Sequence, residues 1–268
     1  MIRKSIKIAF QRLLIFKAYS AINIGGLGIA MAVSLAILLF TFHHFSFDNY
    51  IPNGENSYRL ITRYGDGTYN TNTFAAFSDI LSDYPVIESH TVCYNNHNVE
   101  DVYVDDSKIK VKDAVFVNES FMDYFSIDVK SGNRESIDLP NTMMVTPKMA
   151  LKLFPDGDPL GRTVLLRSFT RNQDSLIAYT ITAIVEAVPA TSHLQYEMLL
   201  SQKGHFDPTV RTLKSRKVLG GVIYVKLYPN SDIAALENSL QTKLLDVLGS
   251  VHGPPLEAFN HSMQAVCD

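Results

Sequence analysis

The chain has 268 residues, a formal net charge of −3 at pH 7 and 19% charged residues. A mildly acidic chain lacks the basic face that binding to nucleic acid requires, so no nucleic-acid partner is expected. With only two cysteines, it also lacks the framework of a small disulfide-stapled domain.

Residues 18–47 contain no charged side chain and dominate the N-terminal part of the sequence. As an α-helix, their centre over residues 22–42 is long enough to cross a bilayer core of about 30 Å. The run is longer than the apolar core of a signal peptide, and bulky residues follow it where a signal peptidase needs small ones. The sequence therefore predicts an uncleaved membrane anchor.

Five basic and no acidic residues lie in residues 1–17, so residues 18–268 carry a net charge of −8. Lysine and arginine beside a membrane span stay on the cytoplasmic side. This predicts a cytoplasmic N-terminus and an exported main domain. Apolar residues at helical spacing also make residues 1–17 a basic amphipathic leader. Composition leaves open whether it only anchors the chain at the membrane surface or contacts a cytoplasmic partner.

Small residues recur every four positions within the apolar run, in two series that we expect to form adjacent ridges. They are Gly26, Ala30 and Ser34, and Gly28, Ala32 and Ala36. Such ridges let a second helix approach closely. The pattern predicts a helix that packs against other membrane helices rather than a lone tether.

Alternating, β-branched and aromatic stretches recur beyond residue 50 and indicate a sheet-rich domain. Strands are expected at 57–63, 86–94, 99–104, 108–111, 114–117, 162–166, 178–185, 194–201 and 222–227. Helical periodicity predicts helices at 74–84, 119–125, 146–154 and 233–248, with Asn118 and Thr146 as N-caps. Residues 57–94 would then form a β-α-β unit.

The sequence contains no P-loop, no nucleophile elbow and no H-E-x-x-H or C-x-x-C motif. His43 and His44 would point about 100° apart on a helix and so would not share a metal ion. Asp156 and Asp158 lack the further ligands of a calcium loop. We therefore expect no enzyme activity and no catalytic, cofactor-binding or metal site, and we expect Cys93 and Cys267 to be free thiols.

Several segments, taken in this order, resemble ABC transporter permeases of the MacB/FtsX-like class, with a MacB-like periplasmic core domain. The matching segments are residues 23–28, 45–48, 58–60, 150–154, 158–164 and 185–194. The resemblance implies an α+β fold with one N-terminal transmembrane helix, followed by an extracytoplasmic domain of β-α-β porter-like units with a mixed α/β insert.

The resemblance also implies an order of parts. A cytoplasmic leader (1–17) and a transmembrane helix with its flanks (18–47) would precede a periplasmic core domain over residues 50–248. Residues 55–94 and 175–248 would build its porter-like part, residues 95–174 the insert, and residues 249–268 a tail.

The implied function is that of a permease subunit in the bacterial inner (cytoplasmic) membrane. It would work as a permease dimer with a cytoplasmic ABC ATPase subunit and engage a periplasmic or outer-membrane partner. Since no further apolar run of about 18 residues follows Phe47, we expect a fragment or truncated piece of such a permease. The alternative is a single-pass sensor or scaffold whose extracytoplasmic domain binds a ligand.

Overall fold

A computed structural model describes residues 15–45, 50–51, 54–64, 66–95, 99–105, 107–170, 173–206, 209–212, 219–248 and 259–266. The chain divides into two compact units, residues 1–47 and residues 48–268. Residues 1–14 of the predicted amphipathic leader lie outside the described residues.

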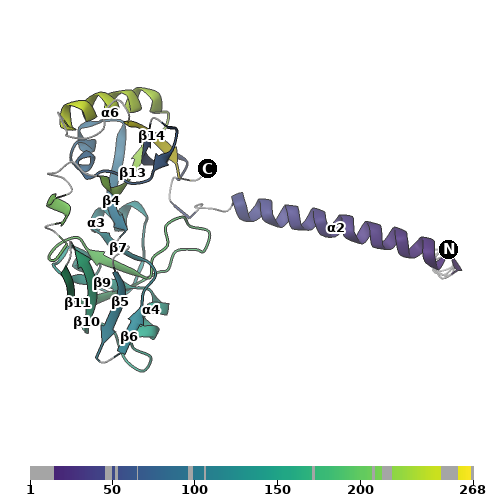
Figure 1. Ribbon diagram of the computed structural model, residues 1–268, viewed down its shortest axis with the longest axis horizontal. Helices are drawn as coiled ribbons and strands as arrows, with labels where there is room; N and C mark the ends of the chain where they lie inside the picture. Colours follow the sequence, from purple (N-terminus) through teal and green to yellow (C-terminus); the bar gives the residue numbers. More distant parts are fainter. Residues whose placement is uncertain are drawn as a thin grey trace. The chain divides into compact units, whose positions relative to one another are not determined.

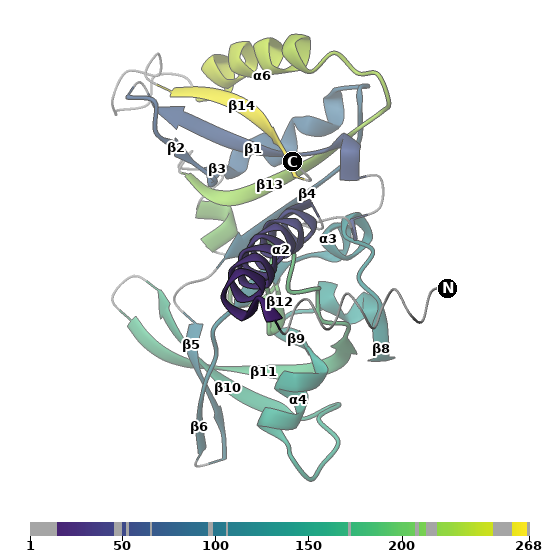
Figure 2. The same ribbon diagram turned by 90° about the vertical axis from the view of Figure 1, so that its right-hand side faces the viewer.

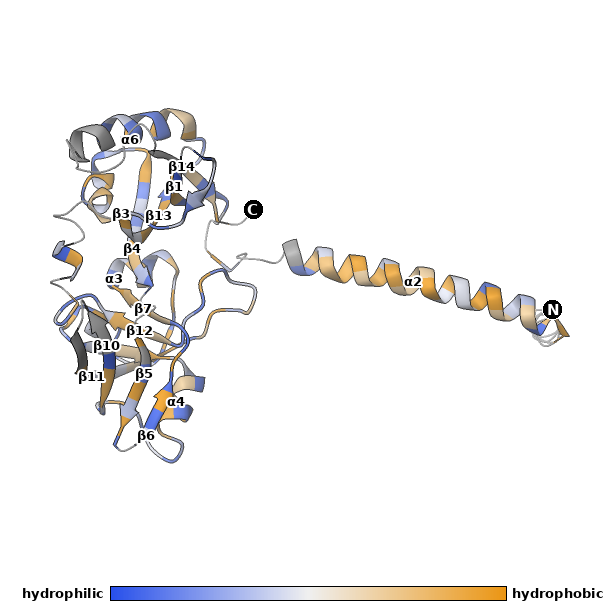
Figure 3. Ribbon diagram, viewed as in Figure 1, coloured by the Kyte–Doolittle hydropathy of each residue, from blue (hydrophilic) through white to orange (hydrophobic). Residues whose placement is uncertain are grey.

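The N-terminal unit is one α-helix, α2 (Lys17–Phe45). Residues 17–43 are long and apolar enough to cross a membrane, and none of this stretch is buried. Apolar residues, in orange, recur along most of the helix (Figure 3), and exposed ones such as Ile22, Ile24 and Leu27 point to different sides of it. A helix that is apolar all round belongs in a protein core or in lipid. Because its large side chains are exposed, α2 is not a core helix, and the predicted apolar helix is confirmed.

The second unit, the outer domain, begins with a four-stranded antiparallel sheet in the order β14-β1-β13-β4. These strands are β1 (Ser57–Tyr64), β4 (Ile87–Asn95), β13 (Leu219–Leu227) and β14 (Phe259–Ala265). Two short 3-10 helices connect β1 to β4, and α6 (Ile233–Leu248) connects β13 to β14 (Figures 1 and 2). The same strand–helix–strand pattern therefore occurs twice, as in ferredoxin-like folds.

The strand β14 lies within residues 249–268, which the sequence predicted as a tail. It pairs with β1 at seven positions, from Tyr58 opposite Ala265 to Tyr64 opposite Phe259. The Glu237 carboxylate on α6 also accepts a hydrogen bond from the Met263 amide. The sequence did not predict this strand because polar residues interrupt the alternation that marks a half-buried strand.

The sheet continues from β4 into a second group of strands, in the order β7-β12-β9-β11-β10-β5-β6. The bounds are β5 (Val99–Val104), β6 (Ser107–Lys110), β7 (Ala114–Val117), β9 (Thr142–Val145), β10 (Thr163–Thr170), β11 (Gln173–Val185) and β12 (Met198–Ser201). The β7–β12 and β9–β11 pairs are parallel. Short strands β2 (Tyr69–Asn70), β3 (Thr73–Phe74) and β8 (Val129–Gly132) pair with β1, β13 and β11.

Two short helices begin at the caps that the sequence predicted. The Asn118 side chain accepts a hydrogen bond from the Phe121 amide at 3.3 Å, at the start of α3 (Glu119–Tyr124). The Thr146 hydroxyl accepts one from the Met149 amide at 3.4 Å, at the start of α4 (Pro147–Leu153). Each cap satisfies an amide that the first helical turn leaves without an intrahelical partner.

Two hydrophobic clusters occupy opposite faces of this continuous sheet. On β13, Ile223 and Val225 belong to one cluster, whereas Val222 and Tyr224 belong to the other. Successive side chains of a strand point to opposite faces, so a strand buried on both sides contributes to both clusters. The first cluster includes residues of α4 and α6, and the second includes residues of α3.

The prediction of an α-helix over residues 74–84 is wrong. This stretch forms two 3-10 turns, η2 (Ala75–Asp79) and η3 (Leu81–Asp83). The imidazole Nε2 of His90 contacts the Ser78 carbonyl oxygen at 3.1 Å, and the Ser78 hydroxyl donates to the Ala75 carbonyl oxygen. An α-helix would use the Ser78 carbonyl to accept from the amide four residues later. Here the turns are closed instead by bonds three residues apart, such as that from the Ile80 amide to the Phe77 carbonyl oxygen.

The strand pairing also differs from the division expected at residue 174. That boundary falls inside β11, within the hairpin that β11 forms with β10. Strands β11 and β12, expected in the porter-like part, hydrogen-bond to β9, β10 and β7. The backbone groups of these central strands must be paired on both sides, which keeps them in the second group of strands.

We predict that Gly132→Ala destabilises the outer domain by about 2–4 kcal/mol. Gly132 has a φ of +95°, and a Cβ there would clash with the Thr182 carbonyl oxygen on the paired strand β11. Gly67→Ala is the matched control, because Gly67 has a φ of +86° but nothing within 4 Å of its Cβ position. Its cost should be only about 1–2 kcal/mol. Urea unfolding of the two variants measures the difference, and equal losses would contradict the predicted clash.

Candidate functional site

The small residues predicted to pack against other helices all lie on α2 and are exposed. A Cβ added at Gly26 or Gly28 would meet nothing within 4 Å. The Ser34 hydroxyl donates to the Ala30 carbonyl oxygen of its own helix at 2.9 Å. Along these positions, α2 therefore presents only small side chains to its surroundings.

Two adjacent ridges of small residues were expected from the sequence, but on the helix the two series lie on nearly opposite sides. Positions two apart on an α-helix of 3.6 residues per turn point about 200° apart. The Gly26 series and the Gly28 series therefore lie on opposite sides of α2. Larger side chains such as Met31 separate them.

The chain enters the outer domain at Tyr50 and Ile51, which pack against its core, and we call this segment the packed entry. Tyr50 comes five positions after Phe45, the last residue of α2. Ile51 is only 3% exposed and belongs to the second hydrophobic cluster. The Tyr50 and Ser192 hydroxyls lie 3.0 Å apart. The chain is therefore fixed to the domain core as soon as it enters it.

A buried tyrosine on β13 continues this entry into the sheet. The Tyr224 hydroxyl lies 2.8 Å from the His193 Nε2 atom, and the Phe125 ring contacts the Tyr224 ring edge to face at 5.0 Å. Burial raises the pKa of Tyr224 well above its ordinary value, so its hydroxyl stays protonated. We call Tyr50, Ile51, Ser192, His193 and Tyr224 the entry cluster.

Cys93 lies in the same core as the entry cluster. It is fully buried and unpaired. Burial raises the pKa of its thiol to about 12, although the Arg59 charge acts in the opposite direction. Since the thiolate is the reactive form, this thiol is a packing group rather than a nucleophile. Cys267 lies outside the described residues.

The segment over residues 150–164, which carried part of the resemblance, forms the corner between α4 and β10. The Arg162 guanidinium lies over the Phe154 ring, 4.8 Å from its centroid. Gly161 has a φ of +77°, and its amide donates to the Ile181 carbonyl oxygen at 2.7 Å. The Asp158 carboxylate accepts from the Leu160 amide at 3.0 Å. These contacts shape a turn.

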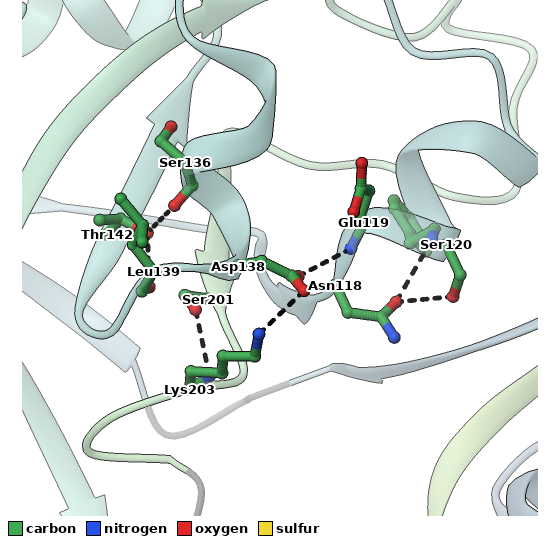
Figure 4. Close-up of polar contacts among 10 residues, drawn as sticks. Asn118, Glu119, Ser120, Ser136, Asp138, Leu139, Thr142, Ser201 and Lys203 are labelled. Atoms are coloured by element: carbon green, nitrogen blue, oxygen red, sulfur yellow. Dashed lines mark hydrogen bonds and ion pairs between the residues drawn. The ribbon is translucent and has the colours of Figure 1, made fainter.

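Polar side chains tie α3 to the short helix η4 (Arg134–Asp138) and to the end of β12 (Figure 4). The Asp138 carboxylate accepts a hydrogen bond from the Glu119 amide at 3.1 Å and pairs with the Lys203 ammonium at 3.0 Å. A carboxylate at the first turn of a helix accepts a hydrogen bond from an amide that has no intrahelical partner. Its negative charge also interacts favourably with the positive end of the helix dipole. The network therefore stabilises the fold.

Within the described part of the chain, no group of three or more His, Cys, Asp or Glu side chains gathers to hold a metal ion. The entry cluster, by contrast, was not predicted from the sequence. Its members come from residues 50–51, 192–193 and 224, and no local spacing relates them. The only signal was that the Ser192-His193-Leu194 stretch carried part of the resemblance.

Comparison with known proteins agrees with this architecture. The chain matches the family model for the MacB-like periplasmic core domain over residues 20–243. A search of curated proteins finds no match.

Three solved structures are similar in fold. A domain assigned to a permease protein of Porphyromonas gingivalis has a TM-score of 0.64 at 19% identity, covering 80% of this chain and 92% of that one. The periplasmic region of MacB from Actinobacillus actinomycetemcomitans gives 0.52 at 16% identity, covering 82% and 92%. The extracellular domain of the noncanonic ABC-type transporter YknZ from Gram-positive bacteria gives 0.50 at 14% identity, covering 78% and 100%.

The chain therefore combines one N-terminal helix that is long and apolar enough to cross a membrane with an α+β domain that has the fold of the periplasmic and extracellular domains of ABC-type transporters. Because the family model spans most of the chain, the protein belongs to the family with a MacB-like periplasmic core domain.

We predict that Tyr224→Phe destabilises the outer domain by about 1–2 kcal/mol, because His193 loses the hydroxyl that it contacts in a buried site. Tyr228→Phe is the control, since Tyr228 is 52% exposed, and it should change stability by less than about 0.5 kcal/mol.

A double-mutant cycle with His193→Ala tests the origin of the loss. We expect a coupling energy of about 1 kcal/mol from chemical unfolding. Strict additivity would show that the hydrogen bond does not contribute to stability.

Proposed function

We propose that the chain acts as a permease subunit, or as a piece of one, in an ABC transporter or mechanotransmission complex. The match to the family model over residues 20–243 carries this proposal, because it includes both the apolar helix and the outer domain. The outer domain would engage a substrate or partner proteins on the far side of the membrane.

The proposed partners follow from the parts of the chain. No P-loop occurs in the sequence, so the energy would come from a separate cytoplasmic ABC ATPase, and the chain itself would catalyse no reaction. A second permease copy would complete a dimer, and a periplasmic or outer-membrane protein would meet the outer domain. Within that domain, the sheet around β1, β4, β13 and β14 would be the porter-like part and the strands beyond β4 the insert.

We further propose that the helix lies in the inner membrane with its N-terminus in the cytoplasm. The five basic residues of the leader support this orientation. The opposite small-residue ridges on α2 would let it pack between two neighbouring helices.

Membrane topology and complex formation test the proposal. Alkaline phosphatase fused after Asn49 should be active in a bacterial host, whereas the same fusion after Lys17 should be inactive. The chain should also resist extraction by alkaline carbonate and co-purify with an ABC ATPase in mild detergent. An inactive Asn49 fusion, or repeated purification without an ATPase, would overturn the proposal.

We predict that Gly26→Leu and Gly28→Leu each reduce association of α2 with its neighbouring helices by about threefold or more, because bulk on a small-residue ridge prevents close approach. Met31→Leu is the control, since it changes shape little and lies off both ridges. Co-purification of differently tagged copies measures self-association, and recovery of the ATPase measures assembly of the complex. Equal losses in all three variants would contradict a role of the ridges.

A further inference from the structure

A cleft of ≈560 Å³ lies in the outer domain between the β5–β6 hairpin and the corner where α4 leads into β10. Val104 and Ile109 of the hairpin line one side, and Leu153, Phe154 and Pro155 at the end of α4 line the other. Sites for small molecules measure about 300–1,000 Å³ and combine apolar walls with a few polar groups that fix the orientation of the ligand. This cleft fits that description, so its polar groups determine what it can bind.

The Arg162 guanidinium forms part of the cleft wall. It lies over the Phe154 ring, 4.8 Å from the ring centroid. A Cβ added at Gly157, which also lines the cleft, would lie 3.1 Å from an Arg162 Nη atom. The charged group therefore lies beside two residues of the wall. Since Phe154 is buried in the first hydrophobic cluster, its ring supports the guanidinium in a fixed position.

The backbone of Arg162 is also held in place. The Gly161 amide donates to the Ile181 carbonyl oxygen at 2.7 Å, and the Ile181 amide donates to the Arg162 carbonyl oxygen at 2.9 Å. Both bonds tie the corner to β11. A group that is ordered before its ligand arrives loses less conformational entropy on binding.

Two cations of the cleft have hydrogen-bond donors left for a ligand. A guanidinium has five N–H donors, and that of Arg162 makes no hydrogen bond or ion pair with another described residue. The Lys152 ammonium donates to the Lys110 carbonyl oxygen of β6 and thereby links the two sides of the cleft. Since an ammonium has three donors, it can bind a second partner as well.

The acidic residues of the cleft limit the charge of that ligand. Asp105 and Asp156 also line the cleft, and within the described part of the chain neither pairs with Arg162 or Lys152. Since like charges repel, they oppose a multiply charged anion such as a phosphate group. A carboxylate carries a single charge, and its two oxygens match the fork of guanidinium donors.

We propose that this cleft binds an apolar monocarboxylate, with Arg162 as its ion partner and Lys152 as a second cation. The side chains of Val104, Ile109 and Pro155 would surround its apolar part. This site goes beyond the proposed function and does not rest on it. The C-terminus of an apolar peptide and a fatty acid share this chemistry, so the test contains one arm for each source.

The experiment uses the full chain in nanodiscs, with empty nanodiscs as the baseline, and measures the broadening of fluorine NMR signals. The peptide probe is trifluoroacetyl-leucyl-leucine and the fatty-acid probe is trifluorooctanoate, each compared with its uncharged amide. We expect a carboxylate to bind at least about fivefold more tightly than its amide, because only the carboxylate pairs with the guanidinium. A response to the peptide alone assigns a peptide C-terminus, a response to trifluorooctanoate alone assigns a fatty acid, and a response to both assigns the carboxylate class as a whole.

Two substitutions of Arg162 test its role. Arg162→Gln should weaken binding of the carboxylate about tenfold because it removes the charged partner. Arg162→Lys keeps the charge but loses the fork of donors, so it should weaken binding about threefold.

Two further variants exclude a general effect on folding. Asp156→Asn should tighten binding about twofold because it removes a like charge from the cleft, and misfolding cannot produce that change. Lys148→Gln, at an exposed lysine of α4 outside the cleft, should bind like the wild type. No binding of either carboxylate, equal binding of the amides, or unchanged binding by Arg162→Gln would overturn the proposal.

Discussion

The outer domain depends on the hydrogen bonding of one strand, β4. From Ile87 to Cys93 it pairs with β13, and at Tyr94 and Asn95 it pairs with β7. The two groups of strands therefore share a strand instead of meeting only through side chains. Because the hydrophobic clusters also run across both groups, a change in the pairing of β4 would expose apolar surface on both faces of the sheet.

Features determined by local chemistry could be predicted from the sequence. The apolar run that became α2 and the caps at Asn118 and Thr146 depend on residues a few positions apart, so a single sequence contains the whole signal. The strand β9, in contrast, was not predicted, because its local sequence lacks such a signal. Its Met143 and Met144 are both fully buried, on opposite faces of the sheet. A strand buried on both faces shows no alternation, and methionine has no strong preference for strands.

Features determined by distant contacts could not be predicted. The periodicity over residues 74–84 corresponds to helical turns, but these are 3-10 turns that pack beside β4, where the Ser78 carbonyl oxygen contacts His90. The entry cluster joins Tyr50 to Ser192, which are 142 positions apart. Family resemblance indicated that the stretch around Ser192 matters, but only the folded chain relates it to the residues after the membrane helix.

The packed entry has a mechanical consequence that a flexible linker would not have. A glycine- and serine-rich linker moves as a random coil and would let a helix move without moving the domain after it. Here Ile51 is buried in the cluster that also contains Tyr224 of β13 and Cys93 of β4. Since protein interiors are close-packed, a displacement of the chain at Tyr50 cannot be absorbed locally without opening a void or straining its neighbours. The shared strand β4 connects this core to the strands beyond it, so the packing at Tyr50 and Ile51 and the hydrogen bonding of the whole sheet belong to one continuous body.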